Sequence, residues 1–67
     1  MKVHLKDSGD TVTIVVDGID IAEYYPEDGE VLVEVGGPEF ESAIRSALQA
    51  RYPDRKVSIQ YFGIDYT

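Results

Sequence analysis

Residues 30–61 read EVLVEVGGPEFESAIRSALQARYPDRKVSIQY and contain the clearest structural pattern of the chain. Valine occupies every second position over residues 31–35, which is the period-two spacing of a β-strand. Pro38 then suits the first position of a helix, because the N–H that proline lacks would have no partner there. Apolar residues follow at helical spacing and predict a helix that lies on a sheet. They are Phe40, Ala43, Ile44, Ala47 and Leu48.

The helix is expected to end at Tyr52, because a residue that precedes proline disfavours the α conformation. Residues 57–62 alternate again and predict a last strand, which Gly63 ends. Within the helix, Glu41 and Arg45 are spaced for an ion pair between neighbouring turns.

The N-terminal half predicts further strands joined by short turns. Alternating apolar residues occur over 2–6 and 11–16, separated by the turn composition Asp7-Ser8-Gly9-Asp10. Asp17-Gly18 predicts a second turn, and residues 24–29 a third. Residues 19–22 fit either a short strand or an irregular connection.

These elements predict one α+β domain over residues 1–67, an antiparallel sheet of four to five strands with one α-helix packed on one face. A ubiquitin-like grasp topology is the alternative.

Composition excludes several classes of function. The 67 residues include 6 Lys+Arg and 13 Asp+Glu, so the formal net charge is 6 − 13 = −7, which argues against binding nucleic acid or an anionic membrane surface. The absence of cysteine excludes disulfides and thiol chemistry. No apolar run is long enough for a membrane span, and the start of the sequence does not resemble a signal peptide, so a cytoplasmic location is expected.

Catalytic and metal-binding residues are sparse. His4 is the single histidine and is expected to face solvent on a strand, and no serine has the context of a nucleophile. Three groups of acids are candidates for binding a hard cation, but none has the spacing of a calcium loop. They are Asp7 with Asp10, Asp17 with Asp20, and Glu27 with Asp28 and Glu30. We therefore expect no enzymatic activity, metal or cofactor.

Charge is unevenly distributed along the chain. Residues 7–44 contain 11 acids and no base, whereas all six Lys and Arg lie outside this interval. Such a concentration of like charge opposes compaction and attracts a basic partner. The predicted partner-binding residues are Asp17, Asp20, Glu23, Tyr24, Tyr25, Glu27, Asp28, Glu30 and Glu34.

Two alternatives to these contacts stay open. For the acids, the alternative is a solubilising surface without a specific partner. For Tyr24 and Tyr25, the alternative is that one tyrosine packs under the loop while the other covers the sheet edge.

In size, acidity and lack of catalytic motifs, the chain resembles the small phage-encoded inhibitors that include anti-CRISPR proteins and other DNA mimics. The resemblance implies a monomeric, non-enzymatic inhibitor. Such an inhibitor would bind a basic nucleic-acid-binding surface of a CRISPR-Cas-like host defence complex, in the cytoplasm of the infected or host cell. The alternative is a structural or adaptor module, ubiquitin-like or designed, that binds a partner protein through a sheet edge.

Overall fold

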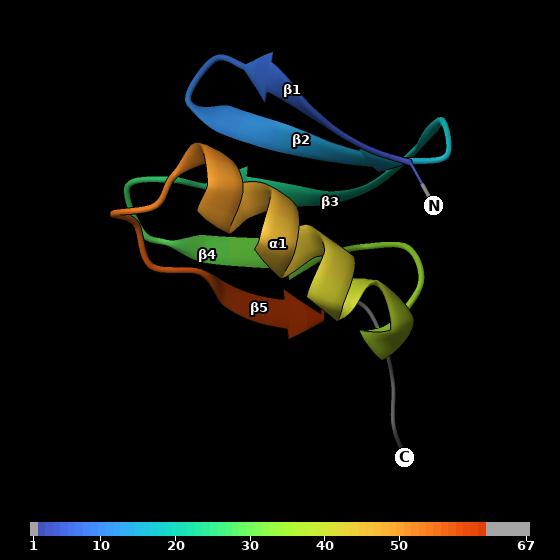
Figure 1. Ribbon diagram of the computed structural model, residues 1–67. Coiled ribbons are helices and arrows are strands. Elements are labelled where there is room, and N and C mark those ends of the chain that lie inside the picture. The colour runs from blue at the N-terminus through green and yellow to red at the C-terminus, as the bar shows by residue number, and fades with distance from the viewer. Residues whose placement is uncertain (1, 62–67) are drawn as a thin grey trace.

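The chain forms a five-stranded sheet whose strands lie side by side in sequence order, with one helix across one face (Figure 1). This computed structural model describes residues 2–61; the predicted strand end at Phe62 and Gly63 lies outside the described residues. The elements are β1 Val3–Ser8, β2 Thr11–Val16, β3 Ile19–Tyr25, β4 Glu30–Val33, the 3-10 helix η1 Pro38–Phe40, α1 Glu41–Arg51 and β5 Ser58–Tyr61.

The predicted α+β class and the single helix on one face of the sheet are confirmed. Strands β1 to β4 pair antiparallel through short turns, whereas β5 pairs parallel with β4. The parallel pair arises because α1 returns the chain across the sheet before β5 begins. Residues 19–22, which fit either a short strand or an irregular connection, belong to β3, the longest of the described strands. β3 also includes Tyr24 and Tyr25, so the turn predicted over 24–29 begins only after Tyr25. The first and last strands lie at opposite edges, which excludes the ubiquitin-like topology.

The turn between β2 and β3 consists of Asp17 and Gly18, both with positive φ, 52° and 84°. Two successive positive φ values define the type I′ turn, whose twist matches that of the two strands it joins. Asp17 also accepts a hydrogen bond from the Lys2 backbone N–H at 2.8 Å, which ties the start of the chain to this turn.

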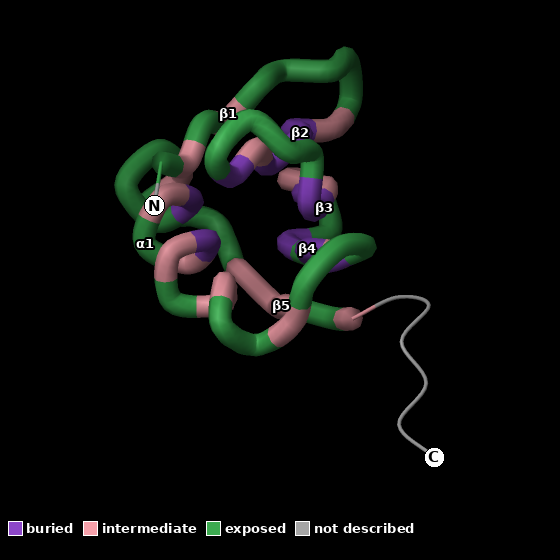
Figure 2. Tube along the Cα trace, turned by 90° about the vertical axis from the view of Figure 1, so that its right-hand side faces the viewer, coloured by how far each residue is buried: buried purple, intermediate pink, exposed green. Residues whose placement is uncertain are grey.

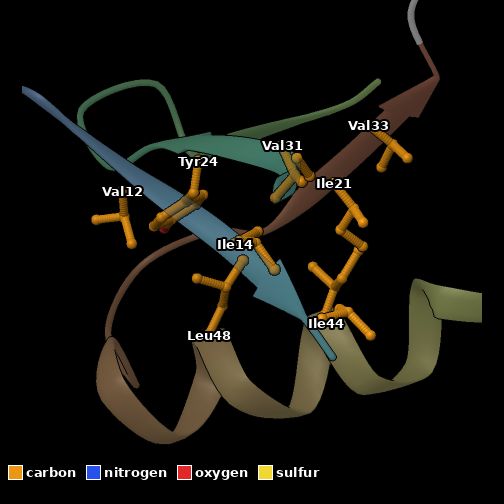
Figure 3. Packing of buried hydrophobic residues seen from close by; sticks show 10 residues of the cluster. Val12, Ile14, Ile21, Tyr24, Val31, Val33, Ile44 and Leu48 are labelled. Carbon is orange, nitrogen blue, oxygen red and sulfur yellow. The ribbon is translucent and has the colours of Figure 1, made fainter. Parts of the chain in front are cut away.

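The core lies between the sheet and α1, where Ile44 and Leu48 are fully buried (Figure 3). Burying each of these side chains stabilises the fold by about 1.5–3 kcal/mol. The predicted Glu41–Arg45 ion pair is present at 4.0 Å, but an exposed pair of this kind contributes only about 0.3–0.5 kcal/mol. Apolar packing therefore holds the helix on the sheet.

Tyr24 joins the core to the segment between α1 and β5. Its side chain is fully buried, its ring lies 5.4 Å from that of Tyr52, and its hydroxyl donates to the Lys56 carbonyl at 3.0 Å. Burial raises the pKa of Tyr24 above that of free tyrosine. Gly29 belongs to the same junction, because a Cβ there would lie 2.8 Å from the Lys56 carbonyl oxygen.

No helix among the described residues is both long and apolar enough to cross a bilayer.

Replacing Tyr24 with phenylalanine tests the Tyr24–Lys56 hydrogen bond. Its loss is expected to cost about 0.5–1.5 kcal/mol, which lowers the melting temperature of a domain of this size by about 2–12 °C. Circular dichroism during heating measures the shift. Tyr25→Phe is the matched control and is expected to lower the melting temperature less, because the Tyr25 hydroxyl makes a longer bond, 3.3 Å, to half-buried Glu23. Equal shifts for the two variants would contradict the burial assigned to Tyr24.

Candidate functional site

The sheet face opposite α1, which we call the open face, is not covered by any helix or strand among residues 2–61 (Figure 2). Cross-strand partners share a face, so the registers identify its members. His4 pairs with Val15, Thr13 with both Lys6 and Glu23, Glu23 also with Leu32, and Tyr25 with Glu30. Strand alternation places Lys2, Asp20 and Glu34 on the same face.

The predicted acids gather on the β3–β4 hairpin. Asp20 and Glu23 lie on the open face of β3 and Glu30 on that of β4, while Glu34 directly follows β4, where alternation places it on the same face. The remaining three lie in the turns that flank β3, Asp17 at one end and Glu27 with Asp28 at the other. All seven are exposed except Glu23, which is half-buried. These seven acids therefore follow the β3–β4 hairpin from one end to the other, and we call them the acidic strip.

Tyr25 lies within the acidic strip. Its hydroxyl donates to Glu23 Oε2, and the negative charge of Glu23 raises the pKa of Tyr25, with smaller contributions from burial, from that hydrogen bond and from Glu34. The influence of Glu34 is consistent with its placement on the open face.

Tyr24 is a correction to the predicted contact set. Because adjacent strand residues face opposite sides of a sheet, Tyr24 points into the core whereas Tyr25 lies on the open face. The Tyr24 side chain is therefore not available at the surface of this fold, and the set is reduced to the seven acids and Tyr25.

Two arginines of α1 form ion pairs with acids that lie outside the acidic strip. Arg51 forms an ion pair with Asp7 at 2.8 Å, and Arg45 pairs with Glu41. Within the described chain, no Lys or Arg side chain forms an ion pair with an acid of the strip. Arg55 donates to the Pro26 carbonyl at 3.1 Å, which places one positive charge beside the turn that contains Glu27 and Asp28. The strip thus retains most of its negative charge.

Two lysines lie at the other side of the same face. Lys2 and Lys6 lie on either side of His4, at the start of the chain and on β1. The strand β2 contains no charged residue and separates these lysines from the acidic strip. His4 is exposed, as predicted. Half-buried Leu32, between Glu30 and Glu34, was not among the predicted contacts, although the alternation along β4 already placed it beside them.

No pocket and no group of three metal-ligating side chains is found within residues 2–61. The chemistry that the open face offers is that of carboxylates, which accept hydrogen bonds from arginine and lysine much as phosphates do.

Comparison of the chain with family models, curated proteins and solved structures found no match.

Replacing Glu23 with glutamine tests the electrostatics of the acidic strip. Removing the negative charge is expected to lower the pKa of Tyr25 toward that of free tyrosine, measured by an NMR pH titration of its ring protons. Because the folded state raises this pKa, the contribution of Tyr25 to stability is complete below about pH 10 and is lost as pH rises through the folded-state pKa. Asp10→Asn, in the turn between β1 and β2, is the control. An unchanged Tyr25 titration in Glu23→Gln would contradict the arrangement.

Proposed function

We propose that this protein is a non-enzymatic inhibitor whose acidic strip binds a basic, nucleic-acid-binding surface of a partner protein. It acts as a monomer and without a cofactor, by occupying lysine and arginine side chains that would otherwise contact phosphates. By class, the partner is a nucleic-acid-handling complex such as a CRISPR-Cas-like defence complex, in the cytoplasm of the cell that contains it.

The observation that carries this proposal is the placement of seven acids without ion-pair partners on an uncovered hairpin. A surface whose only task is solubility is satisfied by charges of both signs, intermixed. Here the arginines of α1 pair with Asp7 and Glu41, neither of which belongs to the strip. The negative charge of the strip therefore remains available to an external cation.

Binding through a sheet edge, the alternative, is less favoured by the contacts of the helix arginines. Arg51 Nη1 donates to the Leu5 carbonyl of edge strand β1 at 3.4 Å. Arg45 Nη1 donates to the Val57 carbonyl, just before edge strand β5, at 2.9 Å. A partner strand that added to either edge would compete with these bonds.

Charge reversal tests the proposal. The probe is a purified CRISPR effector complex loaded with guide RNA, tested as a panel of types, and its binding to labelled target DNA is measured with and without this protein. Asp20→Lys, Glu30→Lys and Glu34→Lys together are expected to abolish inhibition, because they reverse the strip at exposed positions. We expect inhibition by the wild type to weaken steeply between about 50 and about 300 mM salt, because the screening length falls from about 14 Å to about 6 Å over this range.

The matched control combines Asp10→Lys, Glu39→Lys and Asp54→Lys, which changes net charge equally but lies off the open face. This control is expected to retain inhibition. Equal loss in both triple variants would mean that net charge, rather than the strip, determines binding. Inhibition that resists salt would favour the sheet-edge alternative.

A further inference from the structure

The open face presents both signs of charge in separate strips, and this arrangement is complementary to itself. Lys6 lies on β1 and Lys2 directly precedes it, whereas Glu23 and Glu30 lie on β3 and β4 and Glu34 directly follows β4. Uncharged β2 lies between the two groups. We propose that a second copy of this chain packs face to face on the open face. The lysines of each copy then lie over the acidic strip of the other.

This arrangement has a two-fold axis that lies between the two facing sheets. The axis runs parallel to the strands and passes over the boundary between β2 and β3. It places β1 of one copy opposite β4 of the other, and β2 opposite β3. Two-fold interfaces are self-complementary, so every contact between the charged strips occurs twice. A single pair of complementary strips is therefore sufficient for both halves of the interface.

The registers give Lys6 a defined neighbour across the interface. Lys6, Thr13, Glu23 and Leu32 lie in one row across the sheet, so Lys6 meets Leu32 of the second copy. Facing sheets pack about 10 Å apart. The apolar stem of a lysine fits this gap and packs on half-buried Leu32, while its ammonium group reaches Glu30 or Glu34 on either side.

The size of the face sets the strength of the dimer. Four strands about 4.8 Å apart and six residues long cover about 19 × 20 Å, or about 380 Å² per copy. Stable interfaces bury about 800 Å² per partner. We therefore expect a weak dimer that forms at about 0.1–1 mM. At the much lower concentrations of an inhibition assay the protein is monomeric, so the dimer and the proposed inhibitory contact use the same face at different concentrations.

A charge swap tests the dimer more directly than salt does, because salt also screens the repulsion between two chains of net charge −7. One variant combines Lys2→Glu and Lys6→Glu, and the other Glu30→Lys and Glu34→Lys. In each variant alone, positions 2 and 6 carry the same sign of charge as positions 30 and 34, which face them across the interface, so each is expected to remain monomeric by sedimentation equilibrium at 1 mM. An equimolar mixture pairs unlike strips again and is expected to form dimers. Its total net charge, −11 − 3 = −14, equals that of two wild-type chains.

Glu39→Lys with Asp54→Lys is the control, since it matches the second variant in charge but lies off the open face; it should dimerise as the wild type does. A monomeric wild type at 1 mM would overturn the proposal, as would dimers of either swapped variant alone or a mixture that stays monomeric. Concentration-dependent amide shifts of the wild-type protein provide a measurement that needs no variant. Shifts on β1, β3 and β4 support the interface, and shifts confined to α1 contradict it. None of these results depends on inhibition of a nuclease, so the two proposals fail independently.

Discussion

One helix packed on a five-stranded sheet covers only one of its two faces, and the remaining structure follows from this constraint. The sheet is about 24 Å wide at about 4.8 Å per strand, whereas a helix with its side chains is about 10–12 Å across. The core is therefore deepest under β2, β3 and β4, where Ile14, Tyr24 and Val31 are fully buried. The edge-strand residues Leu5 and Ile59 remain half-buried. The opposite face has no described layer to cover it, so its side chains must tolerate water.

The same helix also determines which charges stay unpaired. The apolar side of α1 packs on the sheet through Ile44 and Leu48, and the arginines of α1 contact the two edges of the sheet. Arg51 contacts β1 and Asp7, and Arg45 contacts Glu41 and the start of β5. Because these cations lie at the edges and on the helix side, they do not neutralise the acids of the β3–β4 hairpin. The functional proposal thus depends on the packing of α1 as much as on the acids themselves.

Much of the fold followed from local pattern. Valines at every second position predicted a strand over residues 31–35, and β4 covers the first three of these, whereas Val35 lies beyond it and is exposed. The stripe that ends in Leu48 correctly predicted which side of the helix is buried. β3 was harder to predict because its alternation is interrupted. Ile14 pairs with Ala22 but Val15 pairs with Asp20, so Ile21 is an extra residue and two consecutive positions point into the core. A bulge of this kind depends on the partner strand and leaves no period-two signal.

The sequence by itself determined the fold class, the excess of acids over residues 7–44 and the face that α1 buries, because these depend on composition and on spacing between near neighbours. It also indicated the ion pair at Glu41 and Arg45, which are one helical turn apart. Only the tertiary structure decided that Tyr24 lies in the core while Tyr25 lies on the open face, that Arg51 pairs with distant Asp7, and that the lysines of β1 share a face with the acidic strip. Each of these depends on strand register and on contacts between residues far apart in the chain, and neither local propensity nor periodicity specifies them.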